Sequence, residues 1–153
     1  NPQGIDWNSG GQLYASNHGP NRRDGIDRIE RGANYGWPAT CDERGSEFKP
    51  AVRCYTAFTL APCAVAFAGG DLYVAGLRGE QVRRLRIRNG RVLDEEEFLT
   101  GMGRIREVVA HDGWLYAATS NRDGRGRPRE GDDRIVRLPL EPVAVSSGYG
   151  VLP

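Results

Sequence analysis

The feature that most constrains this chain is a threefold repeat of short apolar segments separated by glycine turns. Each repeat has an apolar run, a glycine turn, a strand that begins Leu-Tyr, a polar loop, and a strand in which aliphatic and charged residues alternate. The Leu-Tyr pairs begin at Leu13, Leu72 and Leu115, which are 59 and 43 residues apart. Alternation with a period of two is typical of a half-buried β-strand, and we find no stretch with a helical period. The repeat therefore predicts an all-β fold.

Repeats of this length, each with about four short strands and tight hairpins, are the signature of β-propeller blades. The pairs Gly-Gly, Gly-Asp and Asp-Gly at the turns suit hairpins whose central residues need positive φ. We place the blade-like units at about 1–38, 59–92 and 104–140, followed by a tail at 141–153. The sequence thus predicts about three four-stranded blades.

Three blades do not close a ring, because known propellers have about 4–8 blades. An open ring would leave blade faces unburied, which repeat proteins avoid. We therefore interpret residues 1–153 as the C-terminal part of one larger propeller domain. The alternative is a three-bladed assembly that a second copy completes, as a homodimer.

Composition and charge exclude several classes of protein. At 153 residues, the chain is long enough to bury the core of one domain. The net charge of +1 gives no reason to expect nucleic acid as a partner. No apolar run approaches the roughly 18 residues that a membrane span needs. The acidic run at 94–97 is interpreted as a solvated blade edge rather than as a set of metal ligands.

The three cysteines leave two interpretations open. A disulfide between Cys41 and Cys54 would close a short loop and would suit an exported protein. Three unpaired cysteines are the alternative. An odd count leaves Cys63 either free or buried.

Several residues outside the strands are candidates for a site. The loop at 17–20, NHGP, is tight because glycine and proline restrict its backbone. His18 is a candidate ligand or base, but we expect it to pack beside this loop. We expect Trp37 to anchor a blade. The segment 121–124, NRDG, matches part of a calcium-binding loop but lacks the later ligands, so we do not expect it to bind a metal.

Seven short motifs occur in an order that resembles the soluble pyrroloquinoline quinone (PQQ)-dependent sugar dehydrogenases, the glucose/sorbosone or aldose sugar dehydrogenase family. They are NPQG at 1–4, NHGP at 17–20, DGID at 24–27, NYGWP at 34–38, TLAP at 59–62, GLRG at 76–79 and GRIRE at 103–107. The resemblance covers residues 1 to about 138. It implies a six-bladed propeller that oxidises the anomeric hydroxyl of aldoses to lactones, with PQQ and calcium as cofactors.

The resemblance assigns the metal to a loop. Gly19 and Pro20 match the family pair whose main-chain carbonyls hold the calcium ion. Calcium prefers hard oxygen ligands and accepts carbonyls from a rigid loop, so this assignment is chemically reasonable.

The resemblance also implies five residues that contact PQQ. Arg78 matches a basic residue of the family, and Arg104 and Arg106 match a pair of arginines that flank the cofactor. Because these two are separated by one residue on a strand-like stretch, both should face the same side. Thr59 and Asn1 match polar contacts. PQQ carries three carboxylates and an ortho-quinone, and guanidinium groups bind such planar anions well.

The sequence departs from the family pattern at several positions. Family members commonly have an acidic residue at the position of Gly25 and a small hydroxyl residue at that of Cys63. The family's catalytic histidine base belongs to earlier blades, and its arginine before Asn1 is not in this sequence. We therefore expect no catalytic residue in this chain and no activity from it alone.

The resemblance implies a small aldose substrate, an unidentified electron acceptor, and a periplasmic or secreted location. A propeller that serves as a binding module, without cofactor or catalysis, is the alternative function. A calcium-dependent hydrolase would need an inward cluster of carboxylates, which we do not find in the sequence.

Overall fold

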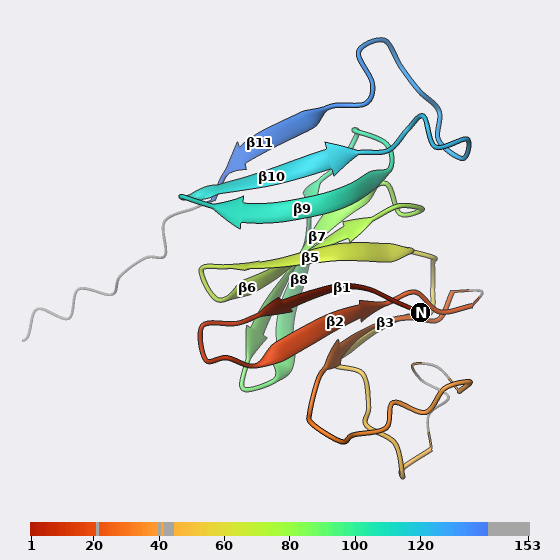
Figure 1. The fold of residues 1–153 in the computed structure, drawn as a ribbon, viewed down its shortest axis with the longest axis vertical. Coiled ribbons are helices and arrows are strands. Elements are labelled where there is room, and N and C mark those ends of the chain that lie inside the picture. The colour runs from red at the N-terminus through yellow and green to blue at the C-terminus, as the bar shows by residue number, and fades with distance from the viewer. Residues whose placement is uncertain (21, 40, 42–44, 141–153) are drawn as a thin grey trace, which may run out of the picture.

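The computed structural model describes residues 1–20, 22–39, 41 and 45–140. This part of the chain contains eleven β-strands and no α-helix, arranged in three antiparallel sheets (Figure 1). The all-β prediction is therefore confirmed. The tail expected at 141–153 lies outside the described residues. No helix in the described part could span a membrane.

The first sheet has the order β1-β2-β3-β4. Its strands are β1 (Pro2–Trp7), β2 (Leu13–Asn17), β3 (Asp24–Arg28) and β4 (Arg53–Tyr55). The fourth strand lies beyond the unit expected at 1–38, because a long connection separates it from β3.

The second sheet has the order β5-β6-β7-β8. Its strands are β5 (Pro62–Ala68), β6 (Asp71–Gly76), β7 (Gln81–Arg88) and β8 (Arg91–Leu99). Short connections join all four strands, and the one between β5 and β6 is the turn that the Gly-Gly pair predicts. At the β5–β6 turn, both Gly69 and Gly70 have positive φ.

The third sheet has three strands among the described residues, in the order β11-β10-β9. They are β9 (Ile105–His111), β10 (Trp114–Thr119) and β11 (Ile135–Pro139). The connection from β10 to β11 is a loop at 120–134, and it leaves the same end of the sheet as the chain's N-terminus (Figure 1).

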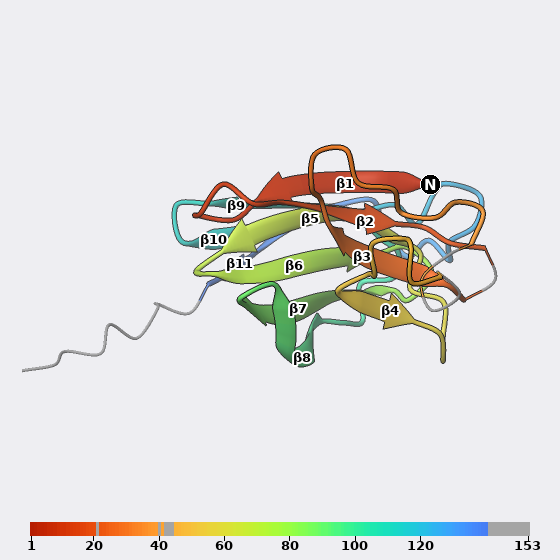
Figure 2. The same ribbon diagram turned by 90° about the horizontal axis from the view of Figure 1, so that it is seen from below.

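The sheets stack face to face, with the second sheet in the middle. Strands β1, β5 and β9 lie along one side of the stack, and β4 and β8 lie along the opposite side (Figure 2). Side chains of β5 and β6 alternate between two cores: Val65 and Leu72 pack toward Tyr14 of the first sheet, whereas Ala66 and Tyr73 belong to the core shared with the third sheet. The middle sheet is apolar on both faces because it has a neighbour on each.

One edge of the stack collects the loops that matter for function. In each sheet the first strand begins, and the second strand ends, at this edge; the pairs are Pro2 with Asn17, Pro62 with Gly76, and Ile105 with Thr119. Loops that precede the first strand or follow the second strand of each sheet therefore gather at one edge, on the right in Figure 1.

The structure shows which cysteines are paired. Cys41 and Cys54 form a disulfide that ties the β3–β4 connection to β4. Cys63 is unpaired and buried in β5, with its sulfur 3.2 Å from the carbonyl oxygen of Ile105. The disulfide alternative is therefore confirmed, and Cys63 is both free and buried.

The acidic run at 94–97 is a solvated edge at three of its four positions. Asp94, Glu96 and Glu97 have more than half of their side chains exposed, but the Glu95 side chain is only 9% exposed. It forms ion pairs with Arg53 of β4 and Arg83 of β7. The prediction is wrong for Glu95, because the first sheet covers this part of β8.

Candidate functional site

The loops at the shared edge of the three sheets enclose a cavity of about 460 Å³, which we call the rim cavity. It receives residues from the loops after β2 and β6, the connections before β5 and β9, and the β10–β11 loop. Its lining consists of His18, Gly19, Thr59, Ala61, Leu77, Arg78, Arg104 and Arg125. Four of the residues that the sequence assigns to cofactor or metal binding, Gly19, Thr59, Arg78 and Arg104, thus meet in one space.

A buried carboxylate holds the first wall of the rim cavity. Asp24 is fully buried at the start of β3, where one carboxylate oxygen accepts a hydrogen bond from the Gly19 amide at 3.1 Å and the other accepts one from the Ala61 amide at 2.9 Å. Gly19 itself must be glycine, because a Cβ there would overlap with the carbonyl oxygen of Arg23. Asp24 therefore fixes the loop after β2 against the segment before β5.

The loop with Arg78 is fixed to the same segment through its backbone. The amides of Arg78 and Gly79 donate to the carbonyl oxygen of Leu60 at 3.2 and 2.9 Å, and the Leu77 amide donates to that of Ala61 at 3.0 Å. The Arg78 side chain is exposed, and no described residue forms a hydrogen bond or ion pair with its guanidinium. Its charge is therefore available to a ligand in the rim cavity.

Arg104 and Arg106 converge on one carboxylate. Arg104 donates from Nε and Nη2 to Oδ2 of Asp123 at 3.0 and 2.9 Å, and Arg106 donates from Nη2 to the same oxygen at 3.3 Å. The two side chains therefore do face the same side. The Arg104 side chain is 9% exposed and also donates to the carbonyl oxygen of Leu77. Arg104 lines the rim cavity, whereas Arg106 does not.

The charge of Asp123 is strongly stabilised. Backbone amides of Arg125 and Gly126 donate to its Oδ1 at 2.9 and 3.2 Å, and the two arginines donate to Oδ2. These hydrogen bonds, that from Arg125 first and that from Arg104 next, lower the pKa of the Asp123 carboxyl to about 2. The segment 121–124 thus uses its carboxylate to bind arginines.

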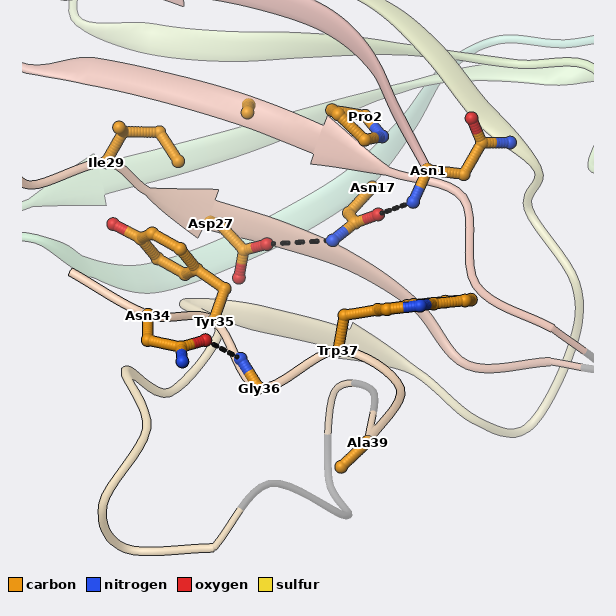
Figure 3. A pocket seen from close by; sticks show the side chains of 11 residues that line it. Asn1, Pro2, Asn17, Asp27, Ile29, Asn34, Tyr35, Gly36, Trp37 and Ala39 are labelled. Atoms are coloured by element: carbon orange, nitrogen blue, oxygen red, sulfur yellow. Dashed lines mark hydrogen bonds between the residues drawn. The ribbon is translucent and has the colours of Figure 1, made fainter. Parts of the chain in front are cut away.

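Asn1 lies at the same edge of the first sheet but lines a different cavity. Its carbonyl oxygen accepts a hydrogen bond from the His18 amide at 2.9 Å, and its amino group donates to Oδ1 of Asn17 at 2.7 Å. The second cavity, of about 320 Å³, is called the aromatic cavity because Tyr35 and Trp37 border it (Figure 3). Asn17 continues the polar side of this cavity by donating to Asp27 at 3.3 Å.

Trp37 does not anchor a blade within the described structure. Its side chain is 70% exposed, and it stands at the mouth of the aromatic cavity (Figure 3). The prediction from sequence is wrong because a large aromatic residue beside a proline turn need not occupy a core position. Tyr35 does fix the turn, since its hydroxyl accepts from the Glu30 amide and donates to the Arg28 carbonyl.

A third cavity, of about 290 Å³, lies between the first strands of the three sheets, β1, β5 and β9. Arg106, Glu107 and Cys63 line it, together with residues 3–5 of β1. Burial raises the pKa of the Cys63 thiol to about 11, so this thiol is neutral near pH 7. Arg106 therefore lies between the third cavity and the rim cavity: it lines the third cavity, and it shares the carboxylate of Asp123 with Arg104, which lines the rim cavity.

The predicted metal ligands are backbone groups, and the described residues include no group of three or more His, Cys, Asp or Glu side chains that could hold an ion. Gly19 lies in the rim cavity and Pro20 follows it in the same loop. Within the described part of the chain, no hydrogen bond uses the carbonyl oxygen of either residue. Both oxygens thus fit the chemistry of a calcium ligand.

Sequence reasoning missed four residues of this region. Asp24 and Asp123 position the loops, Asn121 is a buried amide of the β10–β11 loop, and Arg125 lines the rim cavity. The signal for the first was its place in the DGID motif. The other three lie in the NRDG segment or just after it, which the sequence pattern marks only as a partial metal loop.

Comparison with known proteins identifies the family. The sequence model of the glucose/sorbosone dehydrogenase family matches residues 1–135. The chain is 30% identical to aldose sugar dehydrogenase YliI of Escherichia coli K12, over 81% of this chain and 40% of that protein. It is 50% identical to quinoprotein glucose dehydrogenase B of Acinetobacter calcoaceticus over a stretch of 38 residues, which is 25% of this chain and 8% of that protein.

Solved structures agree. The PQQ-bound form of an aldose sugar dehydrogenase from Streptomyces coelicolor superposes with a TM-score of 0.86 at 38% identity, over 91% of this chain and 43% of that one. An oxidoreductase of Thermus thermophilus, described as a glucose dehydrogenase, gives a TM-score of 0.83 at 45% identity, over 90% of this chain and 44% of that one. This chain therefore spans less than half the length of these relatives. The propeller prediction is confirmed, and the chain belongs to the glucose/sorbosone dehydrogenase family of soluble PQQ-dependent sugar dehydrogenases.

Proposed function

We propose that this chain forms one wall of the cofactor site in a PQQ- and calcium-dependent dehydrogenase that oxidises aldoses to lactones. The observation that carries the proposal is the rim cavity, where Gly19, Thr59, Arg78 and Arg104 from three sheets surround a space of about 460 Å³. When bound, PQQ supplies the acceptor for the two electrons that leave the sugar. The chain's own residues would bind and orient it.

Arg78 is the residue we assign to the carboxylates of the cofactor. Its guanidinium has no partner among the residues that the structure describes, so binding a carboxylate there breaks no existing ion pair. Arg104 is different, because Asp123 already neutralises it and the Leu77 carbonyl orients it. We therefore propose that Arg104 shapes the cavity wall and makes it polar but does not pair with a carboxylate of PQQ. Thr59 adds a hydroxyl that can donate or accept a hydrogen bond.

Calcium is assigned to the carbonyl oxygens of Gly19 and Pro20. The loop is suited to this role because Asp24 holds it from behind through the Gly19 amide and leaves the carbonyl groups of the loop to a ligand. Two carbonyls are too few to satisfy calcium, which takes 6–8 oxygens, so PQQ and water would complete the set.

We expect the catalytic base to lie outside this sequence. The family resemblance implies a histidine base that comes before the position of Asn1 in the chain. Of the two histidines here, His18 borders the rim cavity and His111 is exposed at the end of β9. We propose that the complete active site includes that base and that the described part alone is inactive.

Three further expectations accompany the proposal. The disulfide between Cys41 and Cys54 supports an oxidising compartment, and therefore a periplasmic or secreted protein. An unidentified electron acceptor and a homodimer stay predictions.

Isothermal titration calorimetry of PQQ into the full-length protein tests the proposal. With calcium present, we expect binding at micromolar PQQ or below, and addition of a chelator should weaken it at least tenfold. Absence of binding at micromolar concentrations would overturn the proposal and favour a propeller that acts as a binding module. Binding that a chelator leaves unchanged would remove calcium from the account.

A further inference from the structure

We propose that Arg125, on the β10–β11 loop, is a further anion-binding residue of the rim cavity and that Asp123 positions it there. This inference rests on the proposed function, because it assigns the anion to a carboxylate of PQQ. Arg125 lines the rim cavity together with Arg78, and the loop that carries Arg125 belongs to a different sheet from the loop that carries Arg78. Two loops from different sheets would thus each supply an arginine to the cofactor.

The geometry of the loop places Arg125 by its backbone. The amides of Arg125 and Gly126 both donate to Oδ1 of Asp123, which closes a tight turn. Gly124 has a φ of +83°, and a Cβ at Gly126 would overlap with the backbone of Asn121. Both glycines are therefore required for a turn as tight as this one.

The turn is then attached to the third sheet. Oδ2 of Asp123 accepts from Arg104 and Arg106 at the beginning of β9. Asn121, which is buried, accepts from the Arg104 amide at 2.8 Å and donates to the Met102 carbonyl at 2.9 Å. These contacts fix the loop at the rim cavity. The hydrogen bonds of Asp123 and Asn121 therefore determine where the backbone of Arg125 lies, and the Arg125 side chain is not needed for this.

The charge balance favours an anionic ligand. Asp123 is matched by two arginines, and no described residue pairs with the guanidinium of Arg125 or with that of Arg78. The low pKa of Asp123 keeps its carboxylate charged at every pH at which the protein would work, so it does not become a proton donor to the ligand. The rim cavity therefore has an excess of positive charge that a tricarboxylate would neutralise.

Substitutions in the full-length protein test this inference by PQQ affinity. Arg125→Ala should weaken PQQ binding about fivefold to tenfold, since one charge-assisted hydrogen bond is lost at an exposed site. Arg127→Ala is the matched control: it is on the same loop, is also exposed, and does not line the cavity. It should leave the affinity within about twofold. Arg125→Lys should restore part of the affinity, because lysine keeps the charge but not the planar fork.

A second probe separates charge from packing. The trimethyl ester of PQQ has no carboxylate charge, so Arg125→Ala and the wild type should bind it equally. Asp123→Asn should weaken the binding of PQQ itself at least as much as Arg125→Ala, and adding Arg125→Ala to it should cause little further loss. If Asp123→Asn fails to fold, the comparison of Arg125→Ala with Arg127→Ala still decides whether Arg125 binds a carboxylate of PQQ.

The outcomes distinguish this inference from the proposed function. If the wild type binds PQQ but Arg125→Ala matches Arg127→Ala, the assignment of Arg125 is wrong while the proposed function stands. A loss of affinity that is equal for PQQ and its ester would also overturn the assignment, because it would reflect shape rather than charge. If the wild type does not bind PQQ at all, both proposals fail.

Discussion

Arginines on β7 and two of the three arginines that line the rim cavity are used in opposite ways. On β7, Arg83 pairs with Glu95 and Glu97, and Arg84 donates to Asp71 at 2.8 Å and Glu96 at 3.2 Å. At the rim cavity, Arg78 and Arg125 have no carboxylate partner in the described part of the chain. The same residue type thus stabilises the sheets in one region and is left available for a ligand in the other.

The difference shows why net charge says little about this protein. The chain carries +1 overall, because acidic residues balance nearly all arginines. Pairing, however, is local: the acidic run of β8 faces the arginines of β7, and none of it reaches the rim. A site for an anion is therefore marked by arginines without partners rather than by an excess of arginine.

The largest effect on the free energy of unfolding should come from removing Glu95, the buried carboxylate that pairs with arginines of β4 and β7. Glu95→Ala removes the carboxylate that accepts from Tyr55 at 2.9 Å and pairs with Arg53 and Arg83, so the largely buried Arg83 keeps only the exposed carboxylate of Glu97. Burial, with the nearby Glu95 charge adding to it, raises the pKa of the Tyr55 phenol, so it remains a neutral donor. We expect a loss of about 3 kcal/mol in the free energy of unfolding, measured by urea titration.

Glu97→Ala is the matched control for that prediction. Its side chain is 58% exposed and lies 3.5 Å from Arg83, so its removal should cost less than about 1 kcal/mol. Equal losses for the two variants would show that the burial of Glu95 has no energetic consequence.

At the rim cavity, removing an unpaired arginine should lower the affinity for PQQ and leave the stability of the fold unchanged. Arg78→Ala should weaken PQQ binding about tenfold or more, because a charge-assisted hydrogen bond is lost, while the unfolding midpoint stays unchanged. Calorimetry gives the affinity and thermal unfolding gives the midpoint. If the variant binds PQQ with normal affinity but unfolds at a lower temperature, Arg78 stabilises the fold, as the arginines of β7 do, and does not bind the ligand.

Asp123 pairs with Arg104 and Arg106 and should give a pH-dependent effect. Its folded-state pKa is about 2, below the ordinary value of about 3.9 for an aspartate. The stabilisation is therefore fully present above about pH 4 and is lost as pH falls toward 2. The difference in unfolding midpoint between wild type and Asp123→Asn should shrink over this range. A difference that is constant from pH 5 to 2 would contradict the lowered pKa.

The smallest effect is expected for an exposed pair. Arg86 lies 3.7 Å from Asp94, and about half of each side chain or more is exposed. Arg86→Ala should change the free energy of unfolding by less than about 0.5 kcal/mol and leave PQQ affinity unchanged. A clear loss of affinity would mean that long-range charge, rather than the local pairing pattern, determines binding.

The strands could be predicted from sequence because their signals are local. Alternation of aliphatic and charged residues around Leu85 and the glycine turns at 69–70 act within a few neighbouring residues, and the structure follows them. The burial of Glu95 could not be predicted, because Tyr55 and Arg53 reach it from another sheet, about 40 residues earlier in the chain.

The candidate site was predictable in part for the same reason. Gly19 and Arg78 belong to motifs on loops, and strand topology then brings those loops to one edge. Asp123 and Arg125 were missed because their roles depend on hydrogen bonds to β9 and on loop shape, which leave no pattern in the sequence. Trp37 misled because its type indicates burial, whereas its position in the fold decides exposure.

The most direct test of the account is a crystal structure of the full-length protein with PQQ and calcium. We expect PQQ in the rim cavity, with a carboxylate within hydrogen-bond distance of the Arg78 guanidinium and the metal against the carbonyl oxygens of Gly19 and Pro20. PQQ bound elsewhere, for example in the aromatic cavity beside Trp37, with Arg78 turned away from it, would contradict the account.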